Sequence, residues 1–237
     1  MDQSRRQARL ERNRAQQRRG QLKWLVYISI AAVVVVALLI LANQVKPAEA
    51  RTYNQKNGTT LGDPNAPVHL VEIADFQCPF CHRWYSEVEQ QIIETYVDSG
   101  QVYFTIEVVG FLDSAPNGES TQSAKAAYCA ADQNMFWEYH GVVYANQVGE
   151  NQGAFRDDRL QAFANSLGLD MNSFNVCFSS NEKEADIQAA GDYAANHGIQ
   201  SVPSFVVNDQ DPPYVGLQTF EQLSAILDAA IAAAESN

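Results

Sequence analysis

The chain has 237 residues and a formal net charge of −12, with 16 Lys and Arg against 28 Asp and Glu; its 46% hydrophobic content excludes wholesale disorder. Residues 1–23 contain eight basic residues and only two acidic ones, so this segment carries a charge of +6 and the rest of the chain carries −18. An acidic body argues against nucleic acid as its partner, and four cysteines are too few for a disulfide-dense mini-protein.

The first predicted element is a transmembrane helix at residues 24–42, a run that contains no charged residue. A helix rises about 1.5 Å per residue, so this run matches the roughly 30 Å hydrocarbon core of a bilayer. The basic residues before it place the tail, residues 1–23, in the cytoplasm and everything after the helix outside. The alternative is a signal peptide cleaved after Ala50. Signal peptides usually have a shorter apolar core of about 7–15 residues, so an uncleaved anchor is expected.

The next segment, residues 43–62, is polar and has no hydrophobic periodicity. It contains Pro47 and Gly58, and this composition predicts a flexible linker. The remaining residues, 63–237, have the length of one domain.

A β-α-β unit opens that domain. Residues 68–73 are apolar and mostly β-branched, which is typical of a central strand. Alternating side chains at residues 102–108 predict a second strand. Between the strands, apolar residues recur every four positions and predict an amphipathic helix that Gly100 ends; they are Trp84, Val88, Ile92 and Tyr96.

A stretch rich in Ala, Gln and Asn follows at about residues 119–197 and is predicted to be helical throughout. Further strands are expected at residues 205–207 and 214–215, joined by a turn. An apolar stripe from Phe220 to Ile231 predicts a final helix. The fold class is therefore α/β, in the order β-α-β, helical block, β-β-α.

The chemistry is concentrated in the sequence Cys78-Pro79-Phe80-Cys81-His82, between a predicted strand and a predicted helix. Pro79 suits the first helical position, and Cys78 then lies at the helix N-terminus, where free N–H groups and the helix dipole stabilise a thiolate. Cys81 lies one turn further and faces inward. The pair is predicted to form a reversible disulfide with one exposed and one protected sulfur.

Other uses of this motif are possible. Cys-x-x-Cys-His is also the attachment pattern of c-type haem, with His82 as axial ligand, but the body offers only Met135 and Met171 as methionine candidates for a second ligand. A structural disulfide in so short a loop would gain little chain entropy. A zinc site needs ligands at short spacing, and the other candidates are scattered; they are Cys129, Cys177, His69, His140 and His197. No metal and no cofactor are therefore expected.

The string VEIADFQCPFC, followed by a distant Val-Pro before a strand, resembles the DsbA-like thiol:disulfide oxidoreductases of the thioredoxin superfamily. The resemblance covers about residues 61–237. It implies a thioredoxin-like fold in which residues 119–197 are the helical insertion. Residues 201–205 match the cis-proline loop of the superfamily. This implies that Val202 and Pro203 face the cysteine pair and, with Pro79 and Phe80, bind the substrate peptide.

The resemblance also implies a role for Glu72, six residues before Cys78. The superfamily has a buried acidic residue there, which could exchange a proton with Cys81. Asp75 is nearer to the motif and could take that role or cap the loop. Phe80 stands where the strongest oxidants of the family have His, so we expect a less depressed Cys78 pKa and a less oxidising potential.

Cys129 and Cys177 both lie in the helical block, on a chain predicted to be exported. A structural disulfide between two helices is expected, and some DsbA-like proteins have one. The alternative is a pair of buried, reduced thiols.

The function implied is that of an extracytoplasmic enzyme that introduces disulfides into reduced exported polypeptides. The resemblance further implies reoxidation by a quinone-linked membrane partner of the DsbB or vitamin-K-epoxide-reductase type. A reductase or isomerase would use the same two cysteines. Isomerases of this superfamily usually add a dimerisation domain, for which the predicted linker leaves no room.

Overall fold

The computed structural model describes residues 24–25, 27–37 and 44–236, which fall into two compact units, residues 1–44 and 45–237. In the first unit, residues 24–25 and 27–37 are helical. The basic tail and residues 26 and 38–42 of the predicted span lie outside the described residues. In the described part of the chain, no helix is long and apolar enough to cross a membrane. The anchor therefore stays a prediction.

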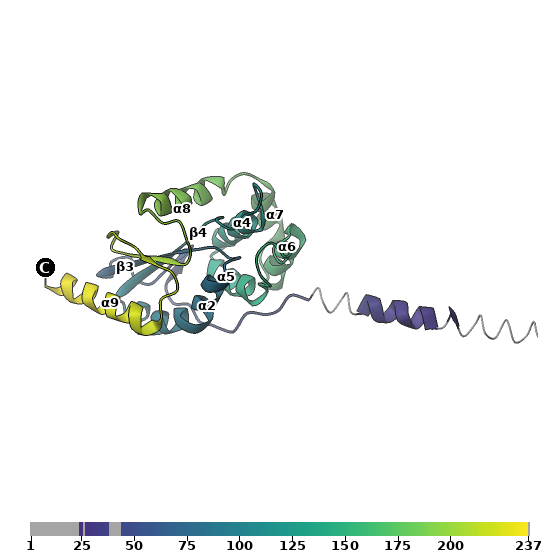
Figure 1. The fold of residues 1–237 in the computed structure, drawn as a ribbon, viewed down its shortest axis with the longest axis horizontal. Coiled ribbons are helices and arrows are strands. Elements are labelled where there is room, and N and C mark those ends of the chain that lie inside the picture. The colour runs from purple at the N-terminus through teal and green to yellow at the C-terminus, as the bar shows by residue number, and fades with distance from the viewer. Residues whose placement is uncertain (1–23, 26, 38–43, 237) are drawn as a thin grey trace, which may run out of the picture. The chain divides into compact units, whose positions relative to one another are not determined.

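The second unit is built on a six-stranded sheet with the order β1-β2-β4-β3-β5-β6. Figure 1 shows helices on either side of this sheet. The strands are β1 (Lys56–Asn57), β2 (Thr60–Leu61), β3 (Val68–Ala74), β4 (Val102–Val108), β5 (Ser204–Val207) and β6 (Tyr214–Val215). β3 pairs with β4 in parallel, and all other neighbours are antiparallel. The four strands predicted from the sequence are confirmed, and the hairpin of β1 and β2 is an addition.

Helices cover both faces of this sheet. Side chains alternate along β3, so Val71 and Ile73 enter a small core shared with α8 (Glu184–Asn196), while Leu70 and Ala74 enter the larger core. Glu72 has the same parity as Leu70 and Ala74. It therefore points toward the larger core, which also contains Cys78 and Cys81.

The predicted four-residue stripe is buried along a continuous helical segment, α2 (Pro79–Trp84), η1 (Tyr85–Glu89), α3 (Gln90–Ile92) and η2 (Ile93–Val97). With 3.6 residues per turn, a spacing of four would rotate the stripe by about 40° per step in a regular α-helix. η1 and η2 are π-helical and hold more residues per turn, which reduces this drift. Gly100 follows with φ +76°, as expected for the end of a helix.

The helical block contains five helices in the described residues, α4 (Glu119–Ala131), α5 (Phe136–Ala145), α6 (Asp157–Ser166), α7 (Met171–Ser179) and α8. The prediction of helix throughout is wrong at residues 146–156, which form a loop. Gly149 and Gly153 in this loop have φ values of +110° and +79°, which a helix does not allow. The last helix, α9 (Phe220–Glu235), begins with a capping box between Thr219 and Gln222.

The predicted linker differs most from the structure. From Val45 onward its residues belong to the same compact unit as the catalytic fold, and β1 and β2 extend the sheet beside β4. Asn146 exchanges two hydrogen bonds with the backbone of Lys46, and Lys56 forms an ion pair with Glu138. Hydrophobic periodicity does not detect such a segment, because polar contacts and the irregularly spaced apolar residues Val45, Ala48 and Tyr53 hold it in place. We call residues 45–53 the strap.

Candidate active site

The two cysteines of the motif lie where β3 leads into α2. Cys78 precedes the helix and Pro79 is its first residue. The N–H of Cys78 donates to the carbonyl of Asp75 at 2.9 Å, and its own carbonyl accepts from the N–H of His82 at 3.1 Å. Its Sγ lies 3.4 Å from the carbonyl oxygen of Val202, and the Val202–Pro203 peptide bond is cis. The structure thus brings together the motif and the distant Val-Pro loop.

The two thiols have opposite electrostatic environments. The pKa of Cys78 falls to about 7, mainly because the Cys81 thiol donates a hydrogen bond to it, with help from the N–H groups of Cys81 and Phe80 and against the effect of burial. Burial raises the pKa of Cys81 well above its usual value, and the nearby Cys78 and Glu72 add to this. Near neutral pH, Cys78 is therefore the nucleophile and Cys81 keeps its proton.

The prediction that the Cys78 sulfur is exposed is wrong. Cys78 retains 4% of its surface and Cys81 none, because the side chain of Cys78 faces the carbonyl of Val202. Phe80 is different, since 56% of its surface is exposed. Phe80 is therefore the exposed large apolar side chain of the motif.

Glu72 is buried beneath the motif. It is 1% exposed, and burial, with the charges of Glu89 and Cys78, raises its pKa well above the usual value. Its Oε2 has no hydrogen-bond partner among the described residues. Such an environment favours the protonated carboxyl group over the carboxylate.

Asp75 organises the loops around the motif. Its carboxylate accepts hydrogen bonds from the N–H groups of Gln77 and Leu112, both at 2.9 Å, and from the hydroxyl of Ser120 at 2.7 Å. Burial raises its pKa to about 6 against the effect of these donors. These contacts match the capping role that the sequence left open for Asp75, and they join β3 to the start of α4.

Sequence reasoning missed Gln147, which lies in the loop after α5. Its Nε2 donates to the carbonyls of Phe76 and Cys78, at 2.6 and 3.1 Å, and so fixes the turn that presents the nucleophile. It also missed Arg51, Glu89 and His140, which form a buried cluster. No local pattern marks Gln147. The one signal for His140 was its position inside an aromatic run, FWEYHGVVY.

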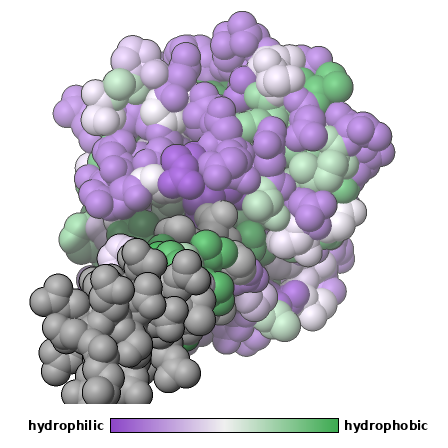
Figure 2. All heavy atoms as spheres, turned by 90° about the vertical axis from the view of Figure 1, so that its right-hand side faces the viewer, coloured by the Kyte–Doolittle hydropathy of each residue, from purple (hydrophilic) through white to green (hydrophobic). Residues whose placement is uncertain are grey.

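Apolar side chains interrupt a mostly hydrophilic surface near the motif. Hydrophilic residues cover most of the face that Figure 2 shows, in keeping with the −18 charge of the chain after residue 23. In the described part of the second unit, six large apolar residues are more than a third exposed: Phe80, Phe111, Val148, Val176, Tyr214 and Val215. Phe111 and Val148 directly adjoin Leu112 and Gln147, which bind the motif's loop. With Phe80 they give the active-site region an apolar surface.

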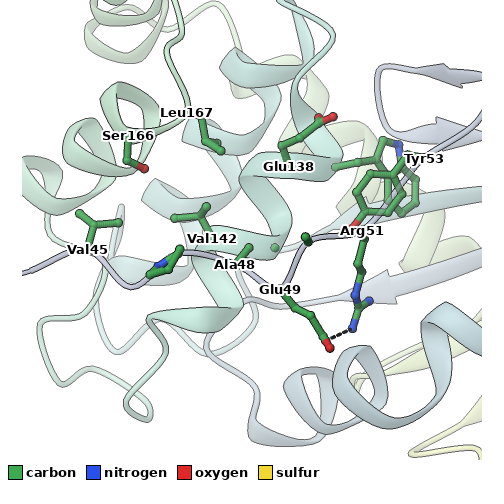
Figure 3. A pocket seen from close by; sticks show the side chains of 13 residues that line it. Val45, Ala48, Glu49, Arg51, Tyr53, Glu138, Val142, Ser166 and Leu167 are labelled. Atoms are coloured by element: carbon green, nitrogen blue, oxygen red, sulfur yellow. Dashed lines mark ion pairs between the residues drawn. The ribbon is translucent and has the colours of Figure 1, made fainter.

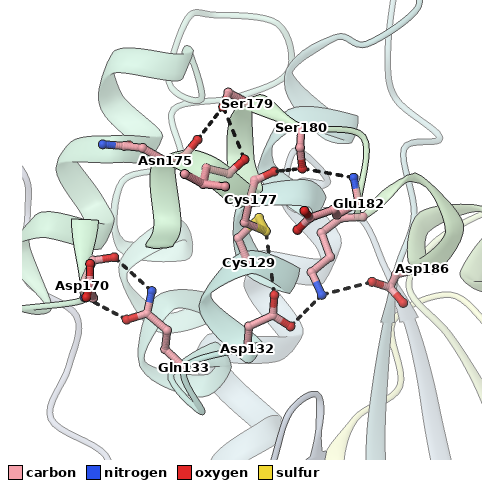
Figure 4. Close-up of a disulfide and its surroundings, with 12 residues drawn as sticks. Cys129, Asp132, Gln133, Asp170, Asn175, Cys177, Ser179, Ser180, Glu182 and Asp186 are labelled. Carbon is pink, nitrogen blue, oxygen red and sulfur yellow. Dashed lines mark hydrogen bonds and ion pairs between the residues drawn. A yellow bond between two sulfur atoms is a disulfide. The ribbon is translucent and has the colours of Figure 1, made fainter. Parts of the chain in front are cut away.

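Cys129 of α4 and Cys177 of α7 are bonded to each other, with their Cα atoms 5.8 Å apart (Figure 4). Asp132 lies beside the bond, with Oδ2 3.8 Å from the Cys177 sulfur, and Lys183 forms an ion pair with Asp132 at 2.6 Å. The covalent bond therefore joins two helices of the block at a distance in sequence from the redox motif.

His82 packs its ring in parallel against Tyr144, with centroids 5.7 Å apart, and burial lowers its pKa. Within the described residues, no group of three or more His, Cys, Asp and Glu side chains is arranged to hold a metal ion.

The chain matches the family model described as Thioredoxin over residues 54–229. It is 25% identical over 189 residues to the probable disulfide bond formation protein D of Bacillus anthracis, covering 77% of this chain and 85% of the relative. It is also 31% identical over 173 residues to the Na(+)/H(+) antiporter NhaA 3 of Salinispora tropica, but that match covers 24% of the antiporter.

Solved structures show the same fold. Oxidised BdbD from Bacillus subtilis superposes with a TM-score of 0.65 at 19% identity, over 79% of this chain and 100% of that one. The α-DsbA1 of Wolbachia pipientis gives 0.64 at 21% identity, over 75% and 92%. The family favours dithiol chemistry over haem attachment at Cys78 and Cys81. The chain belongs to the thioredoxin family and is a DsbA-like thiol:disulfide oxidoreductase.

Proposed function

We propose that this enzyme introduces disulfides into reduced exported polypeptides through the Cys78–Cys81 pair. The observation that carries the proposal is the contrast between the thiols: Cys78 has a pKa of about 7 at the N-terminus of α2, and Cys81 is fully buried with a raised pKa. Lowering the pKa of Cys78 stabilises the reduced enzyme and so raises the potential of the disulfide, and a pKa of about 7 predicts a milder oxidant than a strongly depressed pKa would.

The proposed cycle begins with the disulfide closed. A substrate thiolate attacks Sγ of Cys78, the Cys78–Cys81 bond breaks, and its electron pair goes to Sγ of Cys81. Glu72 gives its proton to Cys81 and becomes a carboxylate. A second substrate thiolate then attacks the mixed disulfide, which leaves the substrate oxidised and Cys78 as a thiolate.

The substrate would lie along the Val202–Pro203 loop. The Val202 carbonyl, 3.4 Å from the Cys78 sulfur, is placed to accept a hydrogen bond from a peptide N–H. Pro79 and Phe80 would form the opposite wall of this site, and the exposed Phe80 ring offers apolar contact.

We also propose the setting in which this cycle runs. The uncharged run at residues 24–42 would anchor the enzyme with the basic tail in the cytoplasm and the catalytic domain outside. A quinone-linked membrane protein of the DsbB or vitamin-K-epoxide-reductase type would take the electrons from the reduced pair. Protease added to intact cells should digest the catalytic domain and spare an epitope at the N-terminus.

The reduction potential of the Cys78–Cys81 pair against glutathione tests the direction. A potential of about −120 mV supports the oxidase, and a potential of about −270 mV refutes the oxidase in favour of a reductase. Phe80 is the observation that favours a reductase, because its exposed ring offers the Cys78 thiolate neither a charge nor a hydrogen bond. Cys78→Ala should abolish exchange, and Cys81→Ala should accumulate mixed disulfides with substrates.

A further inference from the structure

An ion pair lies buried in the larger core. Arg51 of the strap donates from Nη1 to Oε1 of Glu89 at 3.0 Å, and the two side chains are 5% and 0% exposed. Arg51 also donates from Nη2 to the carbonyl of Tyr85 and lies over the Tyr85 ring, 3.9 Å from its centroid. Figure 3 shows the strap, from Val45 to Tyr53, crossing α5, with Glu49 as a second, exposed partner of Arg51.

The other oxygen of Glu89 faces a histidine. Oε2 of Glu89 lies 3.5 Å from Nε2 of His140, which is 1% exposed. Burial lowers the pKa of His140 to about 3, with Arg51 contributing, so this imidazole is neutral. Five aromatic rings have their centroids within 6 Å of the His140 ring: Phe76, Tyr85, Phe136, Trp137 and Tyr144.

This part of the core contains most of the unpartnered polar atoms. In the described part of the chain, nine buried side-chain oxygen and nitrogen atoms have no hydrogen-bond partner. Six of the nine belong to Glu72, Trp84, Glu89, His140 and Tyr144. A buried unpaired group costs about 1–3 kcal/mol, so such a concentration is expected to serve a function beyond folding.

The cluster communicates electrostatically with the redox pair. The charge of Glu89 raises the pKa of Glu72, after burial, and Glu72 in turn raises that of Cys81. Tyr144 is close enough to all three that their charges, after burial, raise its own pKa. An anion at Glu89 therefore makes it harder for Glu72 to lose its proton.

Burial opposes this anion, and Arg51 supports it. The pKa of Glu89 is raised to about 8 by burial even though Arg51 lowers it. Without the guanidinium, the pKa of Glu89 would be higher still. The titratable or charged groups that face this pair from the surrounding elements are Tyr53, Glu72, Tyr85, His140 and Tyr144, with Glu49 at the exposed end.

We propose that Arg51 and Glu89 are positioning residues for the exchange reaction, and that their ion pair keeps on Glu72 the proton that Cys81 takes when the disulfide opens. This inference rests on the proposed function, in which Glu72 is the donor. The strap then contributes a residue to the redox reaction, although it precedes the first strand of the domain and Arg51 contacts Glu89 and Tyr85 rather than the cysteines.

The test is the pH dependence of disulfide opening in the full chain. Oxidised protein is mixed with dithiothreitol between pH 6 and 9, quenched with an alkylating agent, and scored by mass spectrometry for alkylated Cys78. The rate of each variant is divided by the wild-type rate at the same pH, which cancels the titration of the reductant. The variants are Arg51→Met and Arg51→Lys, and the matched control is Arg83→Met, because Arg83 forms an exposed ion pair with Glu87.

For Arg51→Met the ratio should fall as the pH rises through about 8, where Glu89 of the wild type ionises, by up to about tenfold for each pKa unit by which Glu72 is shifted. Arg51→Lys should restore most of the profile, and Arg83→Met should give a flat ratio. A flat ratio for Arg51→Met, at any value, refutes the inference, since a purely structural role would slow the reaction equally at every pH.

A second variant controls for loss of folding in Arg51→Met. The double variant Arg51→Met/Glu89→Gln removes both charges and leaves no unpaired ion, so it remains testable even if Arg51→Met unfolds. It should reproduce the falling ratio, and a wild-type profile would refute the inference. If the wild-type Cys78–Cys81 pair itself fails to react with dithiothreitol, the proposed function fails instead.

Discussion

Removing the Cys129–Cys177 disulfide should cost a large part of the stability of the domain. The bond closes a loop with a sequence separation of 48. In the chain-entropy relation, a loop of this size restricts the unfolded chain by about 4 kcal/mol at 25 °C. Both cysteines are buried, at 1% and 6% exposure, and their helices also contact each other through other residues. Most of the loss is therefore expected to come from the unfolded state.

Urea unfolding of Cys129→Ala/Cys177→Ala measures this loss. The experiment is done in a Cys78→Ala/Cys81→Ala background, so that the active-site thiols cannot exchange with the structural pair. With an m-value of about 3 kcal/mol/M, the midpoint should fall by somewhat more than about 1 M. The m-value itself should rise, because the unfolded chain becomes less compact.

Asp132→Asn is the matched control, since it removes the neighbouring ion pair and keeps the bond. Asp132 is 51% exposed in that pair, so the variant should lose less than about 1 kcal/mol. If the disulfide variant also lost less than about 1 kcal/mol, the loop-closure reasoning would be refuted and the stability of α4 and α7 would come from packing alone.

Three further predictions concern the active site and the strap. The pKa of Cys78 in the folded protein, about 7, lies below its ordinary value of 9.0. The stability of the reduced protein relative to Cys78→Ala should therefore be greatest above pH 9 and decline as the pH falls through 7. Thiolate absorbance at 240 nm should follow the same titration. Glu72→Gln keeps the shape of the side chain but removes the proton donor, so dithiothreitol should open the disulfide at least about tenfold more slowly, and an unchanged rate would exclude Glu72 as donor. Gly141→Ala would place a Cβ 3.1 Å from the Cβ of Ala48 and should destabilise the domain by about 1–3 kcal/mol in thermal melts. The control Gly191→Ala has open space around it and should stabilise the domain by about 0.5–1 kcal/mol. Equal effects of the two substitutions would contradict the close contact between the strap and α5.

The repeating parts of the fold could be predicted because their side chains carry the period of the backbone. Val68 to Ala74 is mostly apolar on both faces, and it is the central strand. The four-residue stripe identified the first helix, although it did not indicate the π-helical turns that align it. The loop at residues 146–156 was missed because the stretch as a whole was predicted to be helical from its composition, although Gly149 and Gly153 have positive φ values.

The site could be predicted only where its residues are adjacent in sequence or matched by resemblance. Cys78 and Cys81 define their own chemistry through a helix N-terminus. Gln147 and Arg51 act through contacts made across 69 and 38 positions of sequence, respectively, and only the folded chain brings those partners together. Burial of Cys78 was missed for the same reason, because the loop that covers it comes from Val202.

The strap also determines where the domain can be cut. A fragment that begins at residue 63, the boundary predicted from the sequence, or at residue 54, where the family match begins, would lack Arg51. Glu89 would then lose the donor to its Oε1, and a buried polar group left unpaired costs about 1–3 kcal/mol. Such a fragment would carry the whole Cys-Pro-Phe-Cys motif and the family signature and still be unstable, so recombinant versions of this enzyme should start at or before Val45.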